Sequence, residues 1–186
     1  GSTFGIISDS TWIEPSSEVI NLLYDSNHSM KVNYGWNLSS SDWLIRIYLS
    51  GGSPREVIFN NSKIMQAYIF GDGSGNSFRF CVDDNLPNSS SSNHEVSPWI
   101  AIDWVGWKLV SWDMSMDGTG SWIGDGNLDG NMRFDSFQLK YNQGQSQFGN
   151  IYIDDFRIAD NVILSNHETN FGQSFSLDGN FPNPFN

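Results

Sequence analysis

Carboxyl groups and histidines are the side chains of this sequence that could carry acid–base chemistry. Retaining glycoside hydrolysis, for example, needs two carboxyl groups about 5 Å apart. The glutamates, no two of which share a strand-like segment at a suitable spacing, are Glu14, Glu18, Glu56, Glu95 and Glu168. The histidines, which fall in turns or loops without metal-ligand spacing, are His28, His94 and His167. The sequence therefore displays no acid–base pair, and catalysis is the weaker hypothesis.

Aromatic rings beside amides and carboxylates indicate binding instead. The chain of 186 residues contains eight Trp, thirteen Phe and six Tyr, which is more indole than a core of this size needs. Trp is hard to bury completely because its N–H requires a partner, so some rings are expected to be exposed. A flat apolar ring edged by amides and carboxylates suits a sugar, whose face offers C–H groups and whose rim offers hydroxyls. The pattern predicts a secreted polysaccharide-binding domain.

Composition argues against several other classes of partner. Asp and Glu number 21 against nine Lys and Arg, and the net charge of -12 disfavours nucleic acid and anionic membrane surfaces. No run of 18 or more apolar residues exists, so no membrane span is expected. Cys81 is the only cysteine, which excludes a disulfide framework and suggests a small packed hydrophobe.

Period-2 alternation of apolar and polar residues predicts an all-β fold. The strand-like segments cover residues 30–35, 43–49, 64–70, 77–83, 99–104, 107–114, 133–141 and 150–158. Residues 18–24 fit either a strand or a short helix, and residues 84–98 read as a long polar loop. Short strands separated by Gly-rich turns, without a long helix, predict one antiparallel β-sandwich.

Side-chain parity predicts a polar face on three of these segments, because successive side chains of a strand point to opposite sides. The residues opposite the apolar positions are Arg46, Tyr48, Arg79, Asp83, Gln138 and Lys140. If the three strands share a sheet, these residues line a groove suited to vicinal hydroxyls; the alternative is an ordinary solvated face. Two tryptophans in loops are expected at the rim, Trp99 and Trp122. Three others lie in dense apolar segments and are expected in the core: Trp104, Trp107 and Trp112.

Two strings give the body of the chain a family resemblance. Residues 149–158, Gly-Asn-Ile-Tyr-Ile-Asp-Asp-Phe-Arg-Ile, resemble the closing strand of jelly-roll carbohydrate-binding modules, and residues 25–32 are similar to the segment before an early strand. The resemblance implies a jelly roll that binds a polysaccharide or oligosaccharide without catalysis and targets an attached, upstream catalytic domain to it. It also implies a structural Ca²⁺, with Asp154 as a ligand and Asp25 or Glu18 completing the shell. The alternative is that Asp154 and Asp155 are solvated charges at an edge strand.

A second, weaker calcium candidate lies in a Gly-rich segment. The string Asp125-Gly-Asn127-Leu-Asp129-Gly reproduces the first six positions of an EF-hand loop. That motif requires a bidentate Glu at its twelfth position, where this sequence has Ser136. A plain Gly-rich turn is therefore favoured over calcium at this loop.

The end of the chain reads as a linker that carries a sorting signal. Residues 175–186, Phe-Ser-Leu-Asp-Gly-Asn-Phe-Pro-Asn-Pro-Phe-Asn, resemble the start of the C-terminal sorting domain of type IX secretion. The resemblance implies export to the cell surface or the medium. The domain prediction is a carbohydrate-binding sandwich over residues 3–160, followed by a linker and a truncated sorting domain over 161–186.

Two other functions remain open for the same fold. A cell-surface adhesin or structural domain would bind a protein partner through a large exposed apolar patch. A polysaccharide lyase or hydrolase would need a convergent acid–base pair. A polar groove with spaced rings would favour sugar over both.

Overall fold

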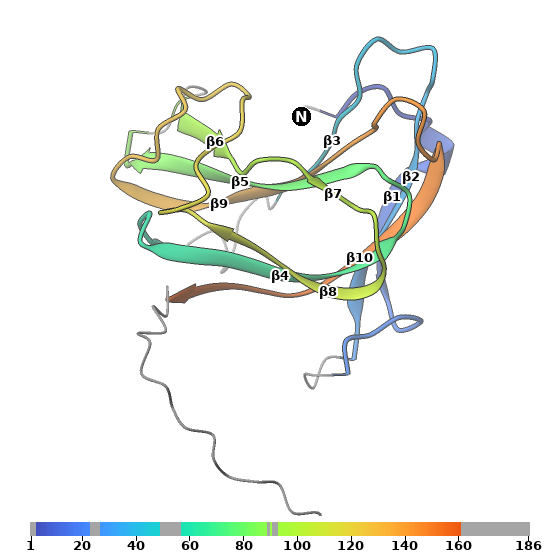
Figure 1. The fold of residues 1–186 in the computed structure, drawn as a ribbon, viewed down its shortest axis with the longest axis horizontal. Helices are drawn as coiled ribbons and strands as arrows, with labels where there is room; N and C mark the ends of the chain where they lie inside the picture. The colour runs from blue at the N-terminus through green and yellow to red at the C-terminus, as the bar shows by residue number, and fades with distance from the viewer. Residues whose placement is uncertain (1–2, 23–26, 49–56, 89, 91–92, 161–186) are drawn as a thin grey trace, which may run out of the picture.

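Two antiparallel sheets face each other across an apolar core in the computed structural model, which describes residues 3–22, 27–48, 57–88, 90 and 93–160 (Figure 1). One sheet has the strand order β1-β2-β10-β4-β8, and the other has the order β3-β9-β5-β6, with β7 also paired to β5. The elements are η1 (Ser8–Ser10), β1 (Trp12–Ser16), β2 (Ser29–Gly35), β3 (Ile45–Tyr48), β4 (Lys63–Asp72), β5 (Ser77–Leu86), β6 (His94–Val96), β7 (Ile100–Ala101), β8 (Val105–Asp113), β9 (Asn131–Lys140) and β10 (Phe148–Asp160). The described residues contain no α-helix, and therefore no helix that could cross a bilayer. The predicted all-β sandwich is confirmed.

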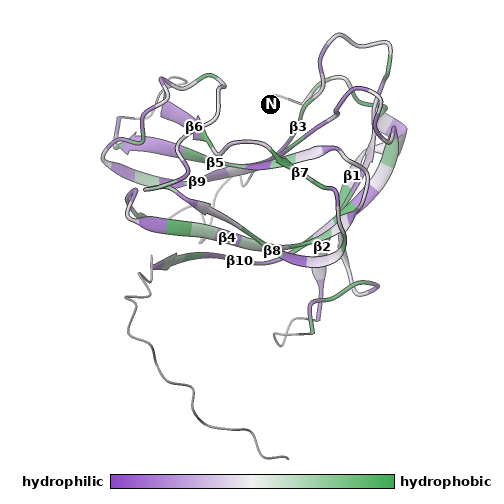
Figure 2. Ribbon diagram, in the orientation of Figure 1, coloured by the Kyte–Doolittle hydropathy of each residue, from purple (hydrophilic) through white to green (hydrophobic). Residues whose placement is uncertain are grey.

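The core is built from the apolar side of each strand. Phe78, Phe80 and Val82 of β5 are fully buried, and they pack toward the facing sheet with residues such as Ile69 and Ile151. Figure 2 shows the underlying pattern as hydrophobic and hydrophilic residues that alternate along the strands. Cys81 is buried as expected, and burial raises the pKa of its thiol well above the ordinary range.

Most predicted strands are present, and the differences have local causes. The segment 99–104 contains only the two-residue β7, while β1 and β6 were not predicted. Strand β1 contains Pro15, which removes a backbone donor and is tolerated because this strand lies at the sheet edge. Strand β6 lies inside the predicted polar loop 84–98, which β5 also shortens by continuing to Leu86. Residues 18–22 form neither helix nor strand.

The three tryptophans expected in the core occupy different environments. Trp112 is 1% exposed and belongs to the main core. Trp104 is partly buried and packs against this core. The expectation is wrong for Trp107, which lies on the other side of β8 and is only half-buried. There its ring packs edge-on against Phe70, and its Nε1 donates to the carbonyl of Ile20 at 3.2 Å. Parity decides the difference, because positions 107 and 112 point to opposite faces of one strand.

Several sequence predictions concern residues outside the described part of the chain. They are Leu49, Asp25 and the whole segment 161–186, with its sorting-domain-like string.

Replacement of Trp112 should test how much this buried indole contributes to the stability of the fold. We expect Trp112→Ala to lower the free energy of unfolding by about 3–5 kcal/mol, because it removes a fully buried indole and its Nε1 hydrogen bond to the Gly118 carbonyl. Trp107→Ala is the matched control on the same strand and should cost clearly less. Urea unfolding followed by far-UV circular dichroism measures both. Equal losses would contradict the separation of the two environments.

Candidate functional site

The strands that carry the predicted polar face are neighbours in one sheet. Strand β9 lies between β3 and β5, and Gln138 is in register with Arg46 on one side and with Arg79 on the other. The three strands therefore share one sheet, which the predicted groove requires. These three side chains form a row across the outer face of the sheet, away from the core.

A β-bulge adds a carboxylate to this face. The register of β5 with β9 shifts between Cys81, opposite Ser136, and Val82, opposite Phe134, so Asp135 is an extra residue. Its carboxylate accepts hydrogen bonds from Arg46 Nη2 at 2.6 Å and from Ser136 Oγ at 2.7 Å. Burial opposes ionisation of Asp135, but these hydrogen bonds outweigh it and hold its pKa below the ordinary value.

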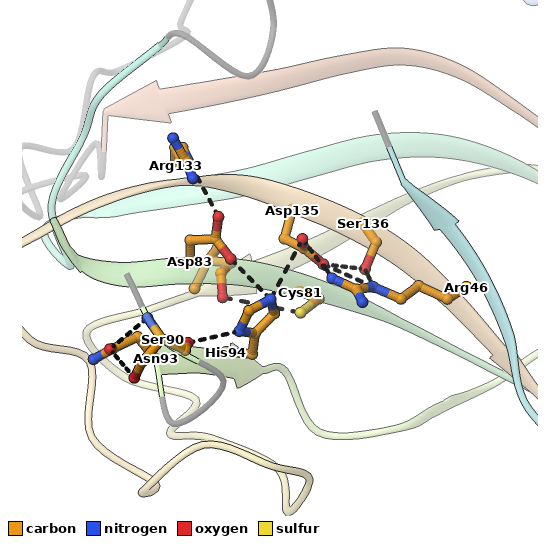
Figure 3. A network of polar contacts seen from close by, with 10 residues as sticks. Arg46, Cys81, Asp83, Ser90, Asn93, His94, Arg133, Asp135 and Ser136 are labelled. Carbon is orange, nitrogen blue, oxygen red and sulfur yellow. Dashed lines mark hydrogen bonds and ion pairs between the residues drawn. The ribbon is translucent and has the colours of Figure 1, made fainter. Parts of the chain in front are cut away.

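The same network continues through Asp83, which is 2% exposed (Figure 3). Arg133 Nε donates to Asp83 Oδ2 at 2.9 Å, and His94 Nε2 lies 3.1 Å from Asp83 Oδ1 and 3.8 Å from Asp135 Oδ1. Asp83, His94 and Asp135 are close enough to hold a metal ion. However, each carboxylate is already paired with an arginine, which would oppose a cation between them. We interpret the cluster as a neutralised charge network that supports the sheet face.

Arg79 is a buried cation beneath aromatic rings. It is 2% exposed, and its guanidinium carbon lies 3.9 Å from the ring centroid of Trp99. Its Nε donates to Gln138 Oε1 at 2.8 Å and its Nη1 to the carbonyl of Ser121 at 3.1 Å. Burial lowers the pKa of Arg79 to about 10. Within the described residues no carboxylate pairs with it, so neutral oxygens and ring faces stabilise its charge.

Rings and cations alternate across this face, although one of the cations, Arg79, lies below the surface. Along the row, the members are Tyr48, Arg46, Trp122, Arg79, Trp99 and Lys140, and successive ones lie 5.6, 5.3, 5.9, 3.9 and 5.4 Å apart, measured from cation to ring centroid. We call this set the ring–cation row. Tyr48 is 53% exposed, and both tryptophans are partly exposed. Such a row offers apolar ring surfaces next to hydrogen-bond donors.

The 114–130 loop brings Trp122 to the face. Glu95 Oε1 accepts the N–H of Gly126 at 3.0 Å, and Asp84 Oδ2 accepts the N–H of Asp129 at 2.8 Å. Both carboxylates are at most 2% exposed. The loop backbone approaches Glu95 so closely that a Cβ on Gly124 would lie 1.9 Å from Oε1. Two buried carboxylates thus hold a loop that has no strand pairing of its own.

The predicted site residues divide by depth. Five reach the surface at least in part: Arg46, Tyr48, Trp99, Trp122 and Lys140. Three are buried and sit beneath them: Arg79, Asp83 and Gln138. Sequence reasoning missed Asp135, because the bulge reverses its parity, and it missed Ser121, whose contribution is a backbone carbonyl that no side-chain pattern reveals.

The calcium candidates are less complete. Asp154 Oδ2 accepts the N–H of Asn21 at 3.4 Å, so the segment before β2 does lie against the closing strand. Glu18 instead accepts a hydrogen bond from Lys31 Nζ at 2.9 Å, which lowers its pKa. In the second candidate, Asp125 Oδ1 accepts the N–H of Asn127. That loop lies against the buried Asp84, whose Oδ2 accepts the N–H of Asp129 and whose pKa is raised by burial.

Comparisons with known proteins concern the fold. No family model matches the sequence, and no curated protein matches it significantly. The family 11 carbohydrate-binding module from Clostridium thermocellum, in complex with a β-1,3-1,4-mixed-linked tetrasaccharide, has a TM-score of 0.52 at 18% identity, over 81% of this chain and 82% of that chain. The family 11 module of a cellulosomal cellulase of the same organism has a TM-score of 0.52 at 16% identity, over 81% of each chain. A family 30 carbohydrate-binding module has a TM-score of 0.50 at 13% identity, over 83% and 75%. The likeness agrees with the predicted jelly-roll sandwich.

Titration of Glu95 should appear in the pH dependence of stability. Burial raises the pKa of Glu95 above its ordinary value of 4.5, so the folded state holds the proton more tightly than the unfolded state. The contribution of this group to the free energy of unfolding therefore falls as pH rises from 4.5 through the raised pKa. Glu95→Gln keeps an acceptor for Gly126 but does not titrate.

We expect the stability of Glu95→Gln relative to the unmodified protein to increase as the pH rises from about 4.5 to 7. Chemical unfolding at several pH values measures this difference. Leu38→Ala, at a residue that is 50% exposed, removes no titratable group, so it is the control and should show a flat difference. A flat difference for Glu95→Gln as well would contradict the raised pKa.

Proposed function

We propose that this domain is a non-catalytic carbohydrate-binding module that binds a polysaccharide on the outer face of the β3-β9-β5-β6 sheet. The observation that carries the proposal is the ring–cation row. Its rings can stack on the C–H face of a pyranose, and the guanidinium of Arg46 and the ammonium of Lys140 can donate to hydroxyls. The fold likeness to carbohydrate-binding modules supports the same conclusion.

The buried members of the face act as supports in this proposal. Gln138 and the Ser121 carbonyl hold Arg79 beneath Trp99, while Asp135 holds Arg46 beneath Trp122. Side chains fixed in this way lose little conformational freedom when a ligand binds, which favours affinity. Gln138 Nε2 is buried and has no hydrogen-bond partner among the described residues, so this amide group leaves one donor of the network unused.

The alternatives fit this face less well. A hydrolase or lyase would need an acid and a base exposed to substrate, whereas Asp83 and Asp135 are buried and paired with arginines. An adhesin would favour a broad apolar patch, whereas this face interleaves each ring with a cation.

Targeting of an attached catalytic domain and export through the type IX pathway complete the proposal. Both rest on the sequence resemblances, which include the sorting-domain-like residues 175–186. Recovery of the full-length protein from the culture medium, and its retention in cells after deletion of that segment, would test export.

Calcium is proposed to stabilise the fold through Asp154, with the Asp125 loop as a weaker second site. Binding to the native state alone stabilises it by RT ln(1 + [L]/Kd), so excess chelator should lower the melting temperature and added Ca²⁺ should restore it. Asp154→Ala should abolish most of that response, and Asp125→Ala should reduce it only slightly. Identical melting curves with chelator and with Ca²⁺ would exclude a structural calcium ion.

Loss of one exposed ring should weaken glycan binding without unfolding the domain. We expect Tyr48→Ala to lower affinity at least fivefold, about 1 kcal/mol, because it removes a stacking surface that is 53% exposed. Leu38→Ala, at a residue that is 50% exposed and outside the ring–cation row, is the control and should bind normally. Isothermal calorimetry against the best ligand of a glycan panel measures both. Unchanged affinity of Tyr48→Ala and of Trp99→Ala would remove this face from the binding site.

A further inference from the structure

A second aromatic hollow lies on the outer face of the opposite sheet. Its volume is about 410 Å³, and it is open to solvent where β1 begins, β2 ends and β10 begins. The lining includes Asp9, Ser10, Trp12, Asn33, Phe148 and Asn150. None of them belongs to the ring–cation row, so the two surfaces are built from different strands and loops.

Two exposed rings stand in the wall of this hollow. Trp12 is 47% exposed and Phe148 is 54% exposed, although the core buries other rings of the same chain completely. An exposed Trp and Phe that share one hollow form an apolar surface that water hydrates poorly, and such surfaces mark binding sites.

The rings rest on a wall that is fixed before any ligand binds. Gly35 accepts the N–H of Ile7 at 2.7 Å and donates its own N–H to Thr11 Oγ1 at 3.1 Å, which ties η1 to the end of β2. A Cβ at position 35 would lie 2.7 Å from Ser10 Cβ and 3.0 Å from Phe148 Cε1. The glycine therefore lets the ring of Phe148 lie directly against the backbone.

Polar groups between the rings define the ligand. Asn33 is in register with Trp12 on one side and with Asn150 on the other, so an indole and two amides form a row across three strands. Asn33 Nδ2 is buried and has no hydrogen-bond partner among the described residues. Asp9 is the only charged residue in the lining and can accept from a pair of hydroxyls.

We propose that this hollow is a second carbohydrate-binding site, which takes a neutral pyranose unit of a glycan. Two rings match the C–H faces of a sugar, and amide, hydroxyl and carboxylate groups match its hydroxyls. A uronate or sulfate is disfavoured, because the lining contains Asp9 and no Lys or Arg. The inference rests on the proposed function for its ligand class, but its residues are independent of the ring–cation row.

The direct test is the indole resonance of Trp12. Titration of the labelled protein with a β-1,3-1,4-mixed-linked tetrasaccharide, cellotetraose, xylotetraose and tetragalacturonate, followed by NMR, reports each of the Trp side chains, and Trp12→Phe assigns the relevant signal. We expect that signal to shift with at least one neutral tetrasaccharide and not with tetragalacturonate. The shift should persist in Tyr48→Ala.

Calorimetry with the same oligosaccharide supplies the second readout. Trp12→Ala should halve the number of ligands bound per chain or lower affinity at one class of site at least fivefold. Ile13→Ala, at the next residue of β1 with 48% exposure, is the matched control and should bind normally. Phe148→Ala provides a second variant on another strand if Trp12→Ala folds poorly.

The outcomes separate the two proposals. Glycan binding that Tyr48→Ala weakens and Trp12→Ala leaves unchanged would overturn the second site while the proposed function stands. Binding that depends on Trp12 and not on Tyr48 would support the second site and would show that the ring–cation row does not bind the glycan. If only tetragalacturonate shifted the Trp12 signal, the neutral-sugar assignment would be wrong. If no carbohydrate in the wider panel bound the unmodified protein, both proposals would fail.

Discussion

The buried guanidinium of Arg79 is the interaction on which the candidate face depends. A charge that is 2% exposed has lost its water and must be stabilised by fixed groups of the protein. The groups that do so come from different parts of the chain: Gln138 from β9, the carbonyl of Ser121 from the 114–130 loop, and the ring of Trp99 from the connection between β6 and β7. One side chain on β5 therefore fixes a sheet, a loop and a connection relative to one another.

Charge on this face is organised independently of the net charge of the chain. The molecule carries -12 overall, yet the face presents Arg46 and Lys140 to the surface while its acids, Asp83 and Asp135, lie buried and paired with arginines. Burial of the acids leaves donors outermost, which suits a ligand rich in acceptor oxygens. The 114–130 loop is held in a similar way. The buried carboxylates of Glu95 and Asp84 accept hydrogen bonds from its N–H groups, and the indole of Trp122 faces outward.

Strand alternation was enough to predict the sandwich and the side of the sheet on which Arg46, Arg79 and Gln138 lie, because period 2 directly reports the face of a strand. Alternation could not predict how deeply they lie, since the cover comes from the 114–130 loop, which has no periodicity. Strict parity would place Asp135 on the core side with Phe137, and only the bulge turns it outward. Strand β1 was missed because Pro15 is typical of turns and is tolerated here only at a sheet edge.

The two aromatic surfaces differ in how the fold supports them, and this difference bears on how a glycan would meet the module. The ring–cation row depends on a loop held by buried carboxylates, whereas the hollow between Trp12 and Phe148 is supported by paired strands and by the close approach at Gly35. Because the two lie on the outer faces of different sheets, a short oligosaccharide cannot bridge them directly. A module with both sites would instead contact separate chains, or distant parts of one chain, and the second contact would form at the raised effective concentration set by the first. Such a module gains retention on a solid polysaccharide from two individually weak sites, which is consistent with rings that remain half exposed.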